Sequence, residues 1–63
     1  MTPKEDSKDL ILNAAFEAFA ENGYDKTSMD DIVKRSGLSK GTLYWHFKNK
    51  HDLFVETLDF VMR

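Results

Sequence analysis

The residues best suited to bind a charged partner lie in a basic segment from Ile32 to His51. The segment carries five bases and no acid, whereas the other residues carry four bases and eleven acids. Because lysine and arginine bind nucleic-acid phosphates, this segment favours DNA binding although the net charge of the chain is −2. A chance cluster of solvated lysines is the alternative. The five bases are Lys34, Arg35, Lys40, Lys48 and Lys50.

Three consecutive large side chains, Tyr44, Trp45 and His46, occupy the middle of the basic segment. Neighbours on one helix cannot all enter a small core, so at least one must face outward, and exposed aromatic side chains usually mark a contact surface. A less specific interpretation has Tyr44 packing partly on the first helix and leaves only Trp45 exposed. His46 is expected to form a hydrogen bond or to face a phosphate.

Gly41 precedes these aromatic residues and lies within a predicted helix. A glycine inside a helix costs about 0.5–1 kcal/mol relative to alanine. Close approach of the helix backbone to DNA would explain that cost. The alternative is a glycine tolerated in a first helical turn, where the penalty is smaller.

The residue sets that enzymes and metal sites need are not visible in the chain. It has no cysteine, and its two histidines, His46 and His51, are five residues apart on different predicted helices without a carboxylate to complete a ligand set. No glycine-rich phosphate loop, Ser/His/Asp set or paired-carboxylate pocket is apparent. We therefore expect neither catalysis, nor a metal, nor a cofactor.

The basic segment must be positioned by helices whose ends the sequence marks. The first helix is predicted to begin between residues 6 and 8, with Asp6 or Ser7 as its N-cap. It should end with Gly23 in a left-handed conformation and Tyr24 folded back on Phe19. Apolar residues at spacings of three and four are expected to face the core. These are Leu10, Ile11, Ala14, Ala15, Ala18 and Phe19, with Phe16 beside them.

A second helix of about two turns should follow one of two overlapping capping boxes. The boxes pair Thr27 with Asp30 or Ser28 with Asp31, and the sequence does not decide between them. Gly37 is expected to end this helix and to start a tight corner.

Two further helix starts follow the corner. Ser39 is the predicted cap of a third helix that extends through Phe47, and Asn49 with Asp52 is the predicted start of a fourth. The fourth helix should turn four apolar side chains inward. These are Leu53, Phe54, Leu58 and Val61.

Two short helices joined by a glycine-containing corner predict a helix-turn-helix over residues 28–47. Leu43 and Phe47 lie four residues apart and define the buried side of the third helix. At about 100° per residue, the opposite side is centred on Gly41 and Trp45. Lys40 lies in the first turn, where such a helix presents its residues to the bases. The predicted fold is all-α, a three-helix bundle with the start of a fourth helix.

Length and hydropathy restrict the class of protein further. Sixty-three residues can form one domain, 1–63, near the lower size limit for a core that folds unaided. No apolar run approaches the roughly 20 residues that span a bilayer, and the polar, acid-containing start is unlike a signal peptide. We expect a cytoplasmic protein without membrane contact.

The sequence resembles the N-terminal DNA-binding domain of the tetracycline-repressor (TetR) family of bacterial regulators. The resemblance extends from Leu10 to Leu58, and its most specific part is the run Gly37-Leu38-Ser39-Lys40-Gly41-Thr42-Leu43-Tyr44-Trp45-His46-Phe47-Lys48-Asn49-Lys50. Further matches are Ile11 to Ala15, Phe19 to Tyr24, Thr27 and Ile32. Val33 and Ser36 depart from the family, which commonly has alanine at both positions.

The resemblance implies a homeodomain-like head and a fourth helix that leads into a C-terminal domain not contained in this chain. It implies a ligand-responsive repressor that binds a palindromic operator in double-stranded DNA as a homodimer, with a small-molecule inducer held by the C-terminal domain. Matched by position, the family's DNA contacts fall on Thr27, Ser28, Met29, Ser39, Lys40, Gly41, Thr42, Tyr44, Trp45, His46 and Lys50.

Three of these positions are implied to bind phosphate. Tyr44 and His46 resemble the family's phosphate-binding pair, and Lys50 resembles its phosphate-binding lysine. For Lys50 the predicted position at a helix N-terminus is an independent reason, because the helix dipole and the charge both attract phosphate.

A protein-interaction module is the competing hypothesis, since helical triplets of this size also bind protein partners. The acid-free segment and Gly41 on the outward side favour DNA, because an interaction module needs neither. An enzyme is the third hypothesis, and the lack of a recognisable set of catalytic residues in the sequence disfavours it.

Overall fold

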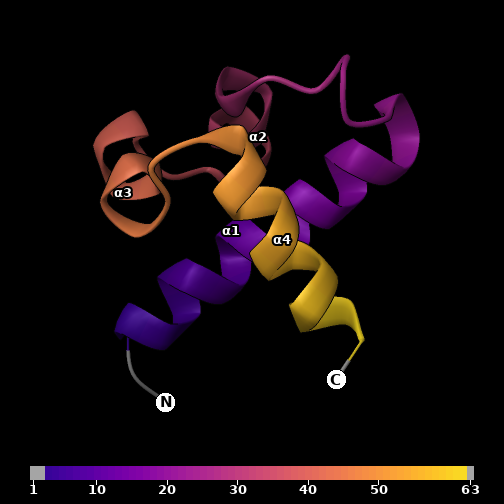
Figure 1. Cartoon of the computed structure of the whole chain (residues 1–63). Coiled ribbons are helices and arrows are strands. Elements are labelled where there is room, and N and C mark those ends of the chain that lie inside the picture. The colour runs from indigo at the N-terminus through magenta and orange to yellow at the C-terminus, as the bar shows by residue number, and fades with distance from the viewer. Residues whose placement is uncertain (1–2, 63) are drawn as a thin grey trace.

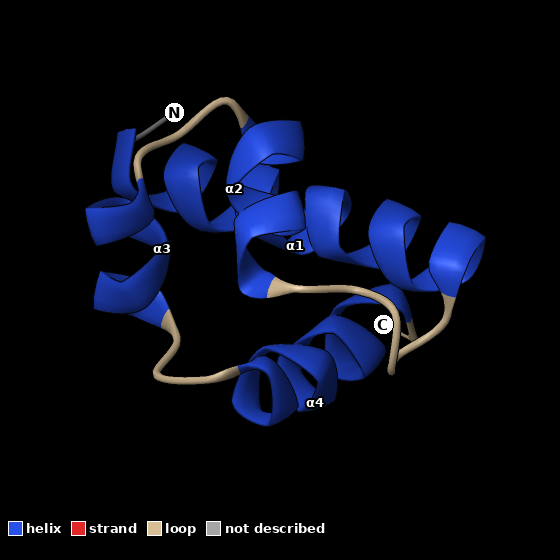
Figure 2. Ribbon diagram, turned by 90° about the horizontal axis from the view of Figure 1, so that it is seen from above, coloured by secondary structure: helices blue, strands red, loops and turns tan. Residues whose placement is uncertain are grey.

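The computed structural model describes residues 3–62, with side chains from residue 7 onward. Over this range the chain forms four helices and no strand, which confirms the all-α prediction. The long α1 crosses behind α4, and the shorter α2 and α3 lie on the far side of that crossing from the end of α4 (Figure 1). Figure 2 presents the same arrangement from above. The helices are α1 (Pro3–Asn22), α2 (Met29–Ser36), α3 (Lys40–His46) and α4 (Lys50–Val61).

The start of α1 differs from the prediction. The helix already begins at Pro3, so Asp6 and Ser7 lie inside it and neither is the N-cap. Proline suits a first helical position, because its φ is already helical and the N–H that it lacks would have no partner there. The capping signal at Asp6 and Ser7 was therefore overridden by an earlier start.

The end of α1 forms as predicted. Gly23 has a φ of 83°, in the left-handed region that favours glycine, and its N–H donates to the Phe19 carbonyl at 2.9 Å. The Tyr24 ring then folds back and stacks on Phe19 with 5.8 Å between ring centroids. Phe54 of α4 packs edge-on against both rings. This aromatic cluster ties the end of α1 to α4.

The buried side of α1 differs in part from the predicted stripe. Leu10 and Phe16 are about half exposed, whereas Leu12 is buried. Since α1 packs against all three other helices, its buried arc is determined by where those helices lie and not by its own spacing alone. The core consists of Ile11, Leu12, Ala14, Ala15, Ala18, Ile32, Leu43, Phe47 and Leu53.

The inward side of α4 also differs from the prediction. Leu53 is buried, but Leu58 and Val61 are 44% and 42% exposed, so their predicted place in the core was wrong. Thr57 is buried instead, and Phe60 packs against the core. The Thr57 hydroxyl donates to the Leu53 carbonyl at 2.7 Å, and this bond lets a polar residue occupy an interior position.

None of the helices within residues 3–62 combines the length and the hydrophobicity that a membrane crossing requires.

Candidate nucleic-acid interface

The start of α2 is held by the capping box between Ser28 and Asp31. The Asp31 N–H donates to the Ser28 hydroxyl at 3.1 Å, and the Ser28 N–H donates to the Asp31 carboxylate at 3.0 Å. These bonds lower the pKa of Asp31, the backbone N–H of Ser28 having the largest effect. The structure thus selects the second of the two overlapping boxes, because Thr27 is engaged elsewhere.

The corner between α2 and α3 is built by Gly37 and Ser36. Gly37 has a φ of 74° and donates its N–H to the Val33 carbonyl at 3.2 Å. The Ser36 hydroxyl donates to the same carbonyl at 3.0 Å and accepts the Leu38 N–H at 3.2 Å. Ser36 therefore stabilises the corner with two hydrogen bonds that an alanine could not make.

α3 begins at the Ser39 cap and presents two different sides. The Ser39 hydroxyl accepts the Thr42 N–H at 3.1 Å and lies 2.9 Å from the Thr42 hydroxyl. Leu43 and Phe47 are buried against the core, as predicted. The opposite side, called here the outer face of α3, is exposed. It consists of Lys40, Gly41, Tyr44 and Trp45.

The exposed aromatic residues answer the question that the sequence left open. Trp45 is 76% exposed and Tyr44 is 41% exposed, so both are available to a partner and not Trp45 alone. His46 is half-buried between the Trp45 and Phe47 rings, at centroid distances of 5.2 and 6.0 Å. Two adjacent aromatic side chains on the outer face provide a contact surface that the core does not use.

Gly41 is not required by the packing of the chain. A Cβ built at this position meets only the Ser39 hydroxyl oxygen, at 3.9 Å, which is an ordinary van der Waals distance. Its φ is not in the left-handed region, so alanine fits the backbone as well. The fold therefore supplies no reason for a glycine here.

A groove of about 480 Å³ runs beside the outer face of α3. Five predicted contact residues line it, and Ser7 of α1 completes it. The sequence indicates Ser7 only as a candidate helix cap, because nothing local shows that the beginning of α1 lies beside α3. The predicted residues that line the groove are Ser39, Gly41, Thr42, Trp45 and His46.

Thr27 does not belong to this surface. Its side chain is 1% exposed, and its hydroxyl donates toward the carbonyls of Ala18, at 3.1 Å, and Gly23, at 2.8 Å. Because the hydroxyl is used inside the junction of α1 and α2, the geometry does not support a side-chain contact from Thr27 to DNA. Of its predicted neighbours, Ser28 is exposed but engaged in the capping box, and Met29 packs partly against the core.

Lys50 is also directed into the fold. Its ammonium donates to the Tyr24 carbonyl at 2.7 Å and lies 4.1 Å from the centroid of the Tyr24 ring. The residue is half-buried and starts α4, as predicted. One of its three N–H donors is therefore used to hold the junction of α1 and α2.

Two other bases of the acid-free segment, Arg35 and Lys40, form ion pairs with acids from outside the segment. Arg35 makes a two-pronged contact with Glu21, at 2.6 and 3.2 Å, and lies 3.9 Å from Glu17. The hydrogen bonds with Glu21 raise the pKa of Arg35 and, in return, lower the pKa of Glu21. Lys40 lies 3.8 Å from the Asp30 carboxylate.

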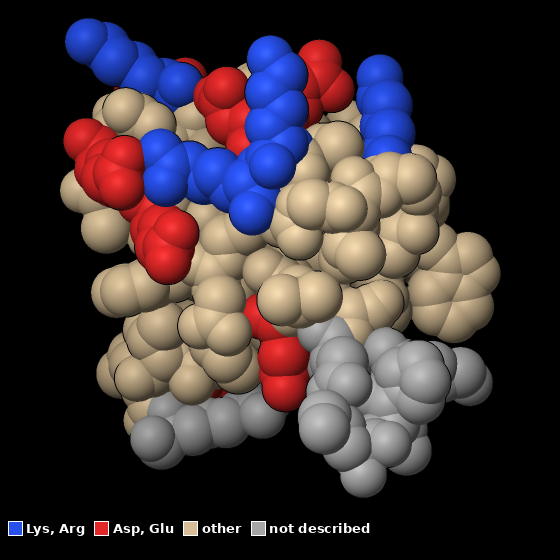
Figure 3. All heavy atoms as spheres, turned by 180° about the vertical axis from the view of Figure 1, so that it is seen from behind, with Lys and Arg blue, Asp and Glu red and all other residues tan. Residues whose placement is uncertain are grey.

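The separation of charge along the sequence is therefore not a separation in space. On the face seen in Figure 3, lysine and arginine side chains lie directly beside acidic ones along the upper edge. Helix packing brings acids of α1 and α2 next to the basic segment, so its bases do not form a surface free of acids.

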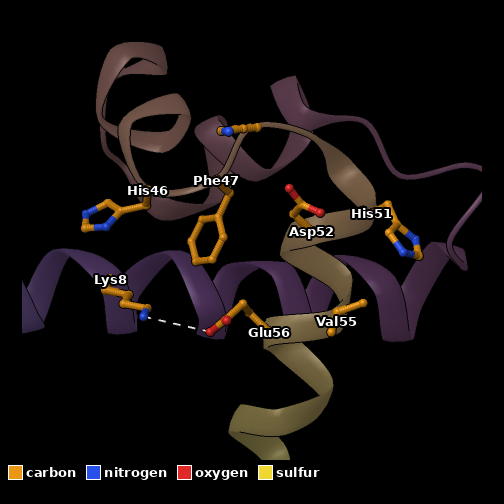
Figure 4. Close-up of a pocket in the computed structure, with 8 residues that line it drawn as sticks. Lys8, His46, Phe47, His51, Asp52, Val55 and Glu56 are labelled. Atoms are coloured by element: carbon orange, nitrogen blue, oxygen red, sulfur yellow. Dashed lines mark ion pairs between the residues drawn. The ribbon is translucent and has the colours of Figure 1, made fainter.

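A second hollow, of about 410 Å³, lies between α1, the end of α3 and the start of α4. Lys8 and Glu56 form an ion pair across it at 3.8 Å, and His46 and His51 stand at its opposite sides (Figure 4). Within the described part of the chain, no three metal-ligating side chains come together.

The chain is similar to known bacterial regulators. Residues 11–57 match the family described as bacterial regulatory proteins, tetR family. The chain is 54% identical to the HTH-type transcriptional regulator QacR of Staphylococcus aureus over 52 residues, which are 82% of this chain and 28% of that protein. It is 40% identical to the regulator AcrR of Shigella flexneri, over 82% of this chain and 24% of that protein. No solved structure matches the chain.

A third relative is named as a negative regulator. The negative transcriptional regulator IcaR of the biofilm operon icaADBC in Staphylococcus epidermidis is 38% identical over 52 residues, 82% of this chain and 28% of that protein. The chain spans about a quarter of the length of these relatives.

Proposed function

The chain belongs to the tetR family of bacterial regulatory proteins, and from this membership we propose that it binds double-stranded DNA by placing α3 in the major groove. Binding of this kind serves transcriptional regulation, the function named for its relatives. The head is proposed to act without catalysis and without a cofactor.

The observation that carries this proposal is the outer face of α3. It combines a lysine, two exposed aromatic residues and a glycine that the packing of the chain does not require. A helix without a side chain at position 41 can approach the floor of the groove closely, while Lys40 and the aromatic residues reach to either side of it. A face with these properties suits DNA better than a flat protein partner.

The remaining contacts divide by chemistry. Ser39 and Thr42 present hydroxyls at the start of α3. Ser28, the N-cap of α2, and Met29, its first residue, are proposed to contact DNA from the start of α2. Tyr44 and His46 are proposed to bind phosphate on either side of the helix. Lys50 is proposed to reach a phosphate with the donors that the Tyr24 carbonyl leaves unused.

The activity of the whole protein is part of the proposal. We propose a ligand-responsive repressor in the cytoplasm that binds a palindromic operator as a homodimer, with dimerisation and inducer binding in a C-terminal domain. The exposed apolar side chains Val55, Leu58 and Val61 of α4, with Met62 directly after it, are consistent with a surface that a further domain covers.

Trp45 provides the test, because it is the one tryptophan of the chain and lies on the proposed interface. Its fluorescence should change when a random-sequence duplex is added at low salt, and the change should be lost at higher salt. If no duplex binds even at low salt, a protein-interaction module becomes the better explanation of the exposed aromatic residues.

A further inference from the structure

Asp30 brings a negative charge to the outer face of α3. Its carboxylate lies 3.8 Å from the Lys40 ammonium, and the two side chains are 71% and 68% exposed. Since the chain has no acid from Ile32 to His51, a carboxylate beside this face must come from another element, and α2 supplies it. The pair joins the first turn of α2 to the first turn of α3.

The two adjacent acids of α2 have different roles. Asp31 is used within its own helix, where it accepts the Ser28 N–H and completes the capping box. Asp30 instead pairs with Lys40 across the corner. The capping box fixes the first turn of α2 and therefore the position from which Asp30 reaches α3. Removing the Asp30 charge leaves that capping box intact.

We infer that Asp30 lowers the affinity for nonspecific DNA, because it restrains Lys40 and so disfavours DNA held by phosphate contacts alone. The inference rests on the proposed function. A nonspecific complex depends on phosphates, and the Asp30 carboxylate beside the first turn of α3 competes with them for Lys40. In the cognate complex, hydrogen bonds from Lys40 to a base edge replace the pair with Asp30.

The test is a double-mutant cycle on the chain with a random-sequence duplex at low salt. Asp30→Asn should bind about three- to tenfold more tightly than wild type, and its salt slope should rise by up to about one unit, because Lys40 becomes free to displace a counterion. In a Lys40→Gln background the same change should have little effect. Asp30→Glu, which keeps the charge, should behave as wild type.

Asp59→Asn is the matched control, because it removes one negative charge from α4 at the end far from α3 (Figure 1). Its affinity should stay near that of wild type. A gain equal to that of Asp30→Asn, or a gain that persists without Lys40, would overturn the inference while DNA binding stands. Failure of the wild-type chain to bind any duplex would instead overturn the proposed function. Thermal unfolding of Asp30→Asn should stay close to that of wild type, because the pair is exposed and only one of the two acids in the first turn of α2 loses its charge.

Discussion

The junction between α1 and α2 and the outer face of α3 both contain residues that the sequence placed among the DNA contacts. In the junction, Thr27 and Lys50 direct their polar groups to carbonyls of the chain itself. On the outer face, Trp45 and Gly41 make no packing contribution that the fold depends on. Similar candidates in the sequence therefore serve folding in one region and remain free for a partner in the other.

The reason for this difference is the number of helices that surround each region. The junction lies where the end of α1, the start of α2 and the start of α4 meet, so its polar groups lose water and must find partners within the chain. α3 packs on the core through Leu43, with Phe47 directly after it, and its other side stays in solvent. Substitutions in the junction should thus change stability, and substitutions on the outer face should change binding.

The largest expected effect is that of Thr27→Val. Valine keeps the shape of the side chain but removes the hydroxyl that donates toward the Ala18 and Gly23 carbonyls. The free energy of unfolding should therefore fall by about 1–3 kcal/mol. In a domain of this size that corresponds to a fall of several degrees in the unfolding midpoint. Thr42→Val on α3 is the control and should cost less stability. A fully stable Thr27→Val protein with weakened DNA binding would place Thr27 in the interface after all.

Gly41→Ala should have the opposite pattern. Alanine is the better helix former and meets no close neighbour, so the variant should be more stable by several tenths of a kcal/mol. The added methyl should cost on the order of 1–3 kcal/mol of operator binding, the scale of one good base contact. Unfolding curves and operator affinity must be measured together. A more stable variant that binds its operator at full strength would show that DNA does not approach Gly41.

Lys50 lies at the border of the two regions, and Lys50→Met should reveal both roles. Loss of the hydrogen bond to the Tyr24 carbonyl should lower stability by about 1 kcal/mol. Loss of a phosphate contact should weaken binding to all sequences alike and lower the salt slope by about one unit. A normal salt slope would assign Lys50 to the junction alone, and a loss confined to one operator would contradict a phosphate role.

The smallest effect concerns pH. The pKa of Glu21 is lowered from its ordinary value of 4.5 by Arg35, and that of Asp31 from 3.8 by Ser28. A carboxylate with a lowered folded-state pKa contributes stability that is complete above its unfolded pKa and is lost as the pH falls through the folded pKa. Stability should therefore be level above about pH 5 and decline below it. Glu21→Gln should reduce that decline, and an unchanged profile would show that the pair with Arg35 adds nothing.

Much of the fold was predictable from short-range signals. The capping residues Ser39 and Asn49 and the glycines at 23 and 37 act on backbone groups three or four residues away, so their effect is contained in the local sequence. The two sides of α3 follow from the spacing of Leu43 and Phe47 for the same reason. The earlier start of α1 at Pro3 is the exception, where two candidate caps lay inside a helix.

The sequence by itself determined where the helices end after Asn22 and Ser36, which side of α3 is buried, and which residues could bind DNA. Only the tertiary structure decided which of those residues remain free. Thr27 and Lys50 find partners 9 and 26 residues away, Lys40 meets Asp30 across the corner, and Thr57 replaces Leu58 in the core. These contacts depend on how the helices cross, because burial and pairing are set by neighbours that are distant in sequence.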